Sequence, residues 1–519
     1  MTMRCAARAA ALFLLAVASP SGAEDVTLTS RDGKTEISGT LLGFDGEFYR
    51  LLTLYGELTV DGSGVTCDGP GCPSMEDFVA RISVSGSASM GAVLVPALLE
   101  AFAERNGYTV RRDVHDEAHF SYELGHASSG KRAAVFSFRI TTSDEGFADL
   151  LANEADMVMS LREVTVEENR LAYQAGLGDL TARNRARVLA LDAIVPIVSP
   201  QNPVQDISPR DLARVFSGEI DNWLALGGPD VPIVPHAPSA DTGLGQAVAT
   251  KVLGPAGLRI SDTVSRHERG QHVTEAVVAD PFAVGLSSFA ETGDAQPLIL
   301  KGACGRVLRA TRRSIKTEDY PLTAPMFLYT PARRLPKVAR DFLVFTRSIA
   351  AQVIIRRAGF VDQASEEIPV SQQGDRFVNA IASAGAEVSL AELQRMADRL
   401  GPMKRLTVSF RFEAGSASLD AQSRSNIVQL ARDIEQGHFD ARTVFFVGFS
   451  DGQGPAERNR QIALTRAEAV RDAVLQAAET VDVSQLNLRV DAFGEALPLA
   501  CDDSAWGRKA NRRVEVWVR

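Results

Sequence analysis

The sequence predicts a multidomain α/β protein with three folded parts. Its 519 residues are enough for two to four domains, and a composition of 45 % hydrophobic and 23 % charged residues is ordinary for globular proteins. Short alternating segments separated by Asp-Gly turns begin the chain, which indicates a small β module. Strands that alternate with amphipathic helices follow, and a mostly polar stretch divides them into a long region and a shorter C-terminal one.

The first 23 residues are predicted to be a cleaved signal peptide. Arg4 and Arg8 precede a short apolar run, Ala9–Ala18, and Ser21-Gly22-Ala23 places small residues at a cleavage site. The run is too short to span a bilayer, and a buried N-terminal helix is the alternative. We therefore expect an exported protein.

Residues 24–75 are predicted to form the small β module. Asp32-Gly33, Asp45-Gly46 and Asp61-Gly62 separate its short alternating segments, and such dipeptides favour hairpin turns. The module carries no pattern that points to chemistry.

Two cysteines of this module are expected to pair. Cys67 and Cys72 bracket a Gly- and Pro-containing turn, and exported proteins can keep disulfides. A zinc knuckle is the alternative for these two residues, but a second pair of ligands is missing. Cys304 and Cys501 could also pair, which the sequence does not decide.

Charge and motifs argue against several classes of function. The net charge is −10 with no block of like charge, so nucleic acid is not expected as a partner. Walker and dinucleotide-binding loops are missing, and we expect no cofactor.

The segment Gly448–Gly452 matches the G-x-S-x-G pattern of hydrolases, but no histidine follows it in the chain. His115 and His119 could share one face of a helix as metal ligands, but a solvated surface is the better interpretation. We expect a protein that is not an enzyme, with an envelope hydrolase as a distant alternative.

Residues 80–365 contain three turns suited to binding an anion. They are rich in Gly, Ser and Thr and stand where strands lead into helices: Ser85–Ser89, Ala155–Arg162 and Ser239–Gly245. Backbone N–H groups and the helix dipole favour negative charge at such junctions. The region is also large enough to form two lobes.

These turns resemble the loops of the periplasmic phosphate-binding proteins of ABC transporters, which have a two-lobed type II binding-protein fold. Ser85-Gly86-Ser87 resembles the first phosphate loop of that family, and Asp241-Thr242-Gly243-Leu244 is similar to its D-S-G-T segment. The resemblance implies an ABC permease as a partner. It further implies that a phosphate-like anion contacts the following residues: Ser85, Gly86, Ser87, Ser160, Arg162, Thr242 and Gly243.

The middle region departs from the family pattern at the second turn. Leu161 stands where phosphate-binding members have an acid that accepts a hydrogen bond from protonated phosphate. Arg162, the next residue, could supply charge compensation and a two-pronged grip on an oxyanion instead. The alternative is a structural anchoring protein whose binding-protein domain has a degenerate, unoccupied cleft.

Residues 405–519 contain an acid and a base on either side of one turn. A predicted linker with a helix, residues 366–404, precedes this region. Asp451 follows a predicted buried strand, and Arg466 lies about two turns into the helix after it. A carboxylate binds an ammonium group well, and a guanidinium binds a carboxylate with two hydrogen bonds. The pair suits a ligand that carries both groups.

This segment resembles the OmpA-like peptidoglycan-binding family, whose motif is T-D-x-x-G-x-x-x-x-N-x-x-L-S-x-x-R-A. The chain has Ser450-Asp451, Asn459 and Arg466-Ala467 at these positions, and its ending G-R-K-A-N-R-R-V-E also matches. The resemblance implies that Asp451 and Arg466 clasp diaminopimelate with the help of Asn459. We expect Asn511 and Arg512 to order the last strand, with contact to the ligand as the alternative. We therefore expect a periplasmic binding protein, associated with the cell wall or outer membrane, that peptidoglycan holds non-covalently.

Overall fold

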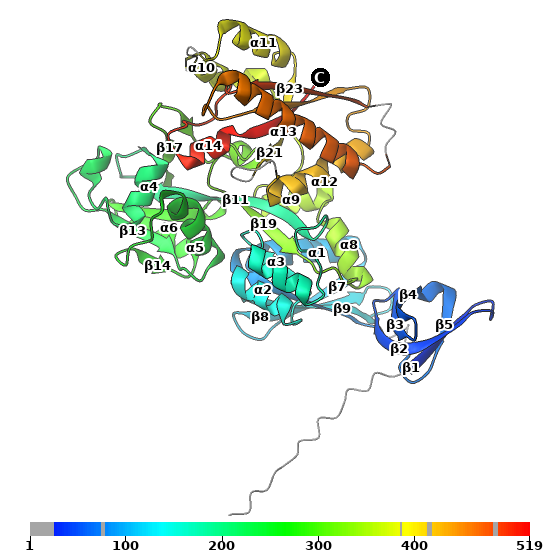
Figure 1. Ribbon diagram of the computed structural model, residues 1–519. Helices are drawn as coiled ribbons and strands as arrows, with labels where there is room; N and C mark the ends of the chain where they lie inside the picture. The colour runs from blue at the N-terminus through cyan, green and yellow to red at the C-terminus, as the bar shows by residue number, and fades with distance from the viewer. Residues whose placement is uncertain (1–24, 74–77, 383, 385–386, 413–417, 481–485) are drawn as a thin grey trace, which may run out of the picture. The chain divides into compact units, whose positions relative to one another are not determined.

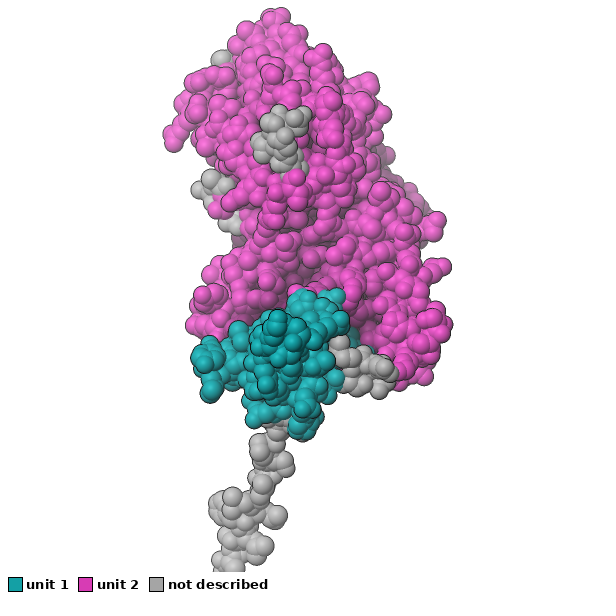
Figure 2. All heavy atoms as spheres, turned by 90° about the vertical axis from the view of Figure 1, so that its right-hand side faces the viewer, with its two compact units in different colours: residues 1–80 teal, residues 81–519 magenta. Residues whose placement is uncertain are grey.

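The computed structural model describes residues 25–73, 78–382, 384, 387–412, 418–480 and 486–519. The predicted signal peptide, residues 1–23, lies outside this part of the chain. The chain divides into two compact units, one up to Ala80 and one from Arg81 to Arg519 (Figure 2). Within the described residues, no helix has the length and apolarity that a membrane crossing requires.

The first unit is a five-stranded antiparallel sheet in the order β4-β3-β2-β1-β5. Val26 and Leu28 of β1 pack with Tyr49 and Leu51 of β3 to form its core. Cys67 and Cys72 form the predicted disulfide, which is confirmed. The strands span the following residues: β1 Asp25–Ser30, β2 Glu36–Phe44, β3 Phe48–Thr53, β4 Gly56–Asp61 and β5 Val65–Asp68.

The middle region is built on one mixed sheet that passes through two lobes. The path β14-β13-β15-β11-β19-β10-β6-β9-β8-β7 runs through it, with β16 beside β11. The long strand β11 pairs with β19 along its first part and with β15 along its second, so β11 and β19 connect the lobes (Figure 1). The strands are β6 Ala80–Ser87, β7 Tyr108–Val114, β8 His119–His126, β9 Arg132–Thr141, β10 Met157–Ser160, β11 Ala186–Val198, β13 Val234–Pro238, β14 Ser265–His267, β15 Ala283–Ser288, β16 Gln296–Pro297 and β19 Thr323–Tyr329.

Helices cover both lobes, and polar residues at their starts fix where they begin. Thr142, Thr165 and Ser208 each accept a hydrogen bond from the backbone N–H three residues on, which satisfies a donor of the first turn. Lobe one carries α1 Val95–Arg105, α2 Ser143–Leu151, α3 Val166–Gln174, α8 Lys337–Phe345 and α9 Ile349–Arg357. Lobe two carries α4 Pro209–Phe216, α5 Gly243–Val248, α6 Gly270–Ala279 and α7 Arg312–Lys316, with a small sheet of β12 Asp206–Ile207, β17 Ile299–Lys301 and β18 Val307–Leu308.

The C-terminal domain is a five-stranded sheet in the order β20-β21-β24-β22-β23. Helices α12 and α13 pack on one face through Leu430, Val470 and Val474. Its strands are β20 Glu367–Pro369, β21 Lys404–Arg411, β22 Thr443–Phe449, β23 Asn487–Gly494 and β24 Arg513–Val518, and its helices are α10 Gly374–Ala382, α11 Leu390–Leu400, α12 Ala421–Glu435, α13 Ala456–Ala477 and α14 Ala505–Asn511.

The segment predicted as a linker, residues 366–404, is not a free connector. Its strand β20 pairs with β21, and its helices cover the second face of the C-terminal sheet, where Met396 and Leu400 pack against Phe449 and Trp517. The polar composition of the segment reflects helices with one buried and one solvated side, and the helix expected within the linker packs on the sheet.

The C-terminal domain contacts both lobes of the middle region. Cys501 forms a disulfide with Cys304 of lobe two, and Trp506 packs into the hydrophobic core of that lobe. On lobe one, the backbone N–H of Ala421 donates to Glu163 at 3.2 Å, and the Ala421 side chain joins the core. A domain that contacts both lobes restrains the hinge formed by β11 and β19.

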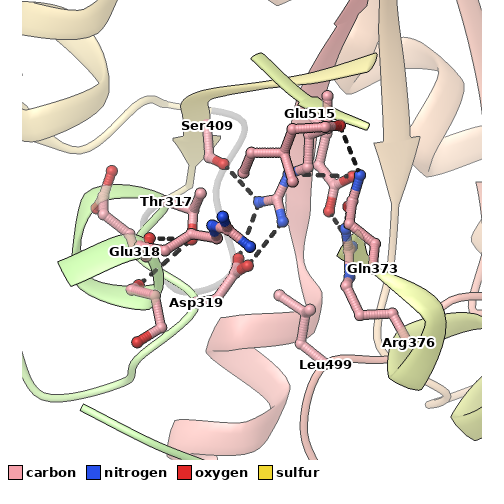
Figure 3. Close-up of polar contacts among 12 residues, drawn as sticks. Thr317, Glu318, Asp319, Gln373, Arg376, Ser409, Leu499 and Glu515 are labelled. Atoms are coloured by element: carbon pink, nitrogen blue, oxygen red, sulfur yellow. Dashed lines mark hydrogen bonds and ion pairs between the residues drawn. The ribbon is translucent and has the colours of Figure 1, made fainter. Parts of the chain in front are cut away.

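Buried charges reinforce the contact with lobe two (Figure 3). Arg405 of β21 binds both carboxylate oxygens of Asp319 at 2.7 and 2.9 Å. Its Nε lies 3.4 Å from Glu515 of β24, which also binds Arg376 of α10 and Arg513. These ions therefore connect three elements of the C-terminal domain to the middle region.

Candidate functional site

The two predicted peptidoglycan-binding residues are brought together by the close packing of α13 on β22. Gly448 of β22 faces the backbone of α13, and a Cβ atom there would lie 2.0 Å from the carbonyl oxygen of Ala463. Only glycine permits this approach. Asp451 follows the end of β22, and Arg466 is one helical turn beyond Ala463, so both lie at the same end of the sheet.

Asp451 is largely buried and has an ionic partner that the sequence did not predict. Its Oδ2 accepts a hydrogen bond from Nη1 of Arg512 at 2.6 Å, and its side chain is 11 % exposed. The prediction that Arg512 orders the last strand did not include this ion pair, which places the Arg512 guanidinium beside Asp451. Asn511 does order the chain, since its side chain binds the backbone of Leu499 and Ala500.

Arg466 is a half-buried cation whose guanidinium lacks a hydrogen bond or ion pair to any residue that the structure describes. It lies over the ring of Phe412, 5.0 Å from the centroid. Burial and the nearby Arg512 lower the pKa of Arg466, whereas Asp451 raises it. A desolvated guanidinium without a partner is costly, so this position favours an incoming carboxylate.

Two further acids face this site that the sequence did not indicate. Asn459 donates to Glu495 Oε2 at 2.7 Å, and the backbone N–H of Gly452 donates to Asp502 at 2.8 Å. Burial raises the pKa of Glu495, and the carboxylates of Asp502 and Asp451 add to the rise. Glu495 follows β23, which pairs in parallel with β22, and side chains after neighbouring parallel strands meet at one sheet edge. That relation was the signal that could have identified Glu495.

The three predicted anion-binding turns of the middle region converge. Gly86 has a φ of +125°, and a Cβ there would lie 2.1 Å from the carbonyl oxygen of Met159 in the second turn. A Cβ on Gly243 of the third turn would lie 3.0 Å from Leu161 and 3.3 Å from Oγ of Ser87. Oγ of Ser87 is buried and has no hydrogen-bond partner in the described part of the chain.

Several predicted anion ligands already bind within the protein. The hydroxyl of Ser85 donates to Asp149 at 2.5 Å, that of Ser160 to the carbonyl of Arg162 at 2.8 Å, and that of Thr242 to the carbonyl of Ser239 at 2.8 Å. These hydroxyls stabilise the turns themselves. Backbone N–H groups of the turns are also used, since those of Leu161, Arg162 and Gly245 donate to hydroxyl groups. Among the described residues, Oγ of Ser87 remains for a ligand.

Arg162 does not point its charge into the convergence of the turns. Its guanidinium binds Asp144 and Glu168, with Nε 3.0 Å from Asp144 and Nη1 2.8 Å from Glu168 and 2.9 Å from the carbonyl of Glu163. Two carboxylates compensate this one cation, so the predicted two-pronged grip on an anion has no support in the geometry.

Comparison with known proteins identifies both large parts of the chain. The model of the PBP superfamily domain matches residues 59–348, more than half of the sequence. The chain belongs to the PBP superfamily. The OmpA family model matches residues 411–512 of the same chain. The predicted fusion of a binding-protein domain with an OmpA-like domain, and the predicted fold class, are confirmed.

Parts of the chain are similar to individual proteins and to solved structures. Protein SphX of Synechococcus elongatus is 25 % identical over 228 residues, which cover 42 % of this chain and 65 % of SphX. The phosphate-binding protein PstS of Borreliella burgdorferi is 25 % identical over 189 residues, covering 34 % of this chain and 64 % of PstS. The chain thus spans just under two thirds of these relatives. The crystal structure of an ABC-type phosphate transport receptor from Vibrio cholerae is 19 % identical, with a TM-score of 0.41 over 54 % of this chain and 99 % of the receptor.

Proposed function

We propose that this chain is an exported, non-enzymatic envelope protein that binds peptidoglycan through its OmpA-family domain and a phosphate-like oxyanion through its middle region. The first activity would hold the protein at the cell wall or outer membrane from the periplasmic side. The second would serve solute capture, with an ABC permease as the receiving partner.

The observation that carries the peptidoglycan assignment is the unpartnered Arg466 beside Asp451. The free end of diaminopimelate has an ammonium and a carboxylate on one carbon. Arg466 offers donors to the carboxylate, while Asp451, with Glu495 and Asp502 near it, offers negative charge to the ammonium. Asn459 positions Glu495, so its role in the proposal is to order the acidic side of the site.

Co-sedimentation with purified sacculi tests this assignment. We expect the full mature chain to pellet with sacculi, and Asp451→Ala and Arg466→Ala each to reduce the bound fraction. Arg471→Ala is the matched control, because Arg471 lies on the same helix and binds only the neighbouring Asp472. Undiminished binding of both site variants would refute the assignment.

The oxyanion assignment rests on the turns that meet around Ser87. Its buried hydroxyl lacks a partner among the described residues, and Gly243 of the third turn comes close to it. A protonated phosphate would need an acceptor, and the Leu161 side chain supplies none, so a fully deprotonated oxyanion such as sulfate is the better candidate. Calorimetric titration with phosphate and sulfate tests this, with Ser87→Ala as the variant that should lose affinity.

A second candidate function for the middle region is that of a rigid scaffold. The C-terminal domain contacts lobe two through Cys501 and Trp506 and lobe one through Ala421. These contacts oppose opening of the hinge between the lobes. Transport proteins of this fold need such opening to exchange ligand. If millimolar phosphate and sulfate give no heat while sacculus binding persists, the scaffold function is the one supported.

A further inference from the structure

A cavity lies where the OmpA-family domain faces lobe one, away from both sites described above. Its volume is about 550 Å³, within the range of small-molecule sites. Helices α12 and α13 supply an aliphatic wall that includes Ile427, Val428 and Ala473. The opposite side comes from the loop that contains Arg183 and from Arg347, which follows α8.

The polar part of the cavity wall is cationic. Arg183, Arg347 and Arg424 line it, and among the described residues no acidic side chain does. Two of these arginines have ionic or hydrogen-bonding partners. Arg183 pairs with Glu479 at 2.8 Å, and Arg424 lies 3.6 Å from Glu163 and donates to a backbone carbonyl.

Arg347 is the uncompensated charge of the group. Its guanidinium makes no hydrogen bond or ion pair with the residues that the structure describes. Burial, together with the positive charges of Arg187, Arg432 and Arg183, lowers the pKa of Arg347 to about 9. The neighbouring cations thus repel one another across a partly desolvated space.

Arg187 shows the same shortage of acceptors. It donates from Nη1 to the carbonyl of Leu343 at 2.9 Å, but its Nε is buried with no acceptor in the described chain. Burial and Arg432 lower the pKa of Arg187 to about 10. Arg187 is not among the residues that line the cavity, so it adds positive charge beside Arg347 and not a donor to a ligand.

We propose that this cavity binds a small amphiphilic anion, with a carboxylate or phosphate head beside Arg347 and an aliphatic body against α12 and α13. The arginines supply the donors and charge that such a head needs. The aliphatic wall excludes a bare inorganic ion as the full occupant, because it would leave most of the cavity unfilled. The site is independent of the diaminopimelate and oxyanion sites.

Calorimetric titration of the full mature chain with four matched probes tests the proposal. Octanoate and octyl phosphate carry a charged head and an aliphatic body, octanol carries only the body, and inorganic phosphate carries only the head. We expect octanoate or octyl phosphate to bind with one equivalent, and the stronger of the two identifies the head. Octanol and inorganic phosphate should not compete with it.

Variants locate the binding. Arg347→Gln should weaken the amphiphile by at least about tenfold, since hydrogen bonds to charged groups contribute about 1.5–3 kcal/mol. It should also raise the melting temperature of the unliganded protein, because one repelled cation is gone. Val428→Trp should block binding by filling the cavity. Arg170→Gln, at an exposed arginine that pairs with Glu167, is the control and should bind as the parent does.

Three results would overturn the proposal. The first is an absence of binding for both charged amphiphiles at millimolar concentration. The second is octanol binding as tightly as octanoate, which would make the arginines irrelevant. The third is unchanged affinity in both Arg347→Gln and Val428→Trp, which would place any bound amphiphile elsewhere. If Arg347→Gln fails to fold, Val428→Trp still decides the location.

Discussion

Replacing Arg405 by alanine should destabilise the large unit by about 3–5 kcal/mol, because it leaves buried carboxylates uncompensated. Arg405 is 1 % exposed and binds Asp319 with both terminal nitrogens. Burial by itself would raise the pKa of Asp319, but Arg405 more than offsets this, and the pKa falls to about 2. Without Arg405, Asp319 keeps only a contact with Arg411 at 3.3 Å.

The same substitution affects a second acid. Glu515 is fully buried, and it retains Arg376 and Arg513 when Arg405 is removed. The network of Figure 3 would therefore be joined to Asp319 of the middle region by the longer Arg411 contact in place of Arg405, while its part inside the C-terminal domain persists. We expect the free energy of unfolding to fall by about 3 kcal/mol, the lower end of the range given above. This corresponds to a change of about two decades in the equilibrium constant for unfolding.

Urea denaturation followed by tryptophan fluorescence measures the effect. Trp506 lies at the contact between the domains, and Trp517 donates to Glu515 at 3.1 Å, so both report on this region. Arg405→Met keeps most of the volume and should cost nearly as much, because the charge is what is lost. Arg170→Ala, in an exposed pair, should give no measurable change. A loss below about 1 kcal/mol for both Arg405 variants would refute the reasoning.

Three further substitutions have expected outcomes. Burial raises the pKa of Glu318 from 4.5 to about 8, so the folded state keeps a proton that the unfolded state loses. The free energy of unfolding should therefore fall as the pH rises from 4.5 to 8. Glu318→Gln should make this fall smaller, as measured by urea denaturation at each pH. Removing the Cys304–Cys501 disulfide, which joins residues 197 apart, should cost about 2–5 kcal/mol, seen as a lower melting temperature of Cys304→Ser/Cys501→Ser. Gly448→Ala should push α13 away from β22 by its clash with Ala463, costing about 1–3 kcal/mol of stability and weakening sacculus binding.

The proposed peptidoglycan site could be formulated from the sequence because its two central residues belong to one strand-turn-helix segment. The distance along the chain from Asp451 to Arg466 fixes their geometry once the strand and helix are recognised. Arg512 could not be found in this way. It comes from the end of α14, and its reach to Asp451 depends on how the last strand enters the sheet beside β22.

In the middle region, the sequence predicted the turns but not the partners of the charged side chain. The small-residue turns were recognisable, and they do converge around Ser87 and Gly243. The assignment of Arg162 as an anion ligand failed to find support because its two acidic partners lie on different elements. Asp144 begins α2 and Glu168 begins α3, and no sequence spacing reveals that both face one guanidinium.

Titration with meso-diaminopimelate tests the central claim, that the pair Asp451 and Arg466 forms the cell-wall site, most directly. The full mature chain should bind one equivalent, and Arg466→Ala should weaken the affinity by at least about tenfold, because a hydrogen-bonded charge pair is lost. Arg471→Ala, at an arginine on the same helix, should bind as the parent does. Equal affinity of the parent and Arg466→Ala, or no binding by a correctly folded parent, would contradict the account.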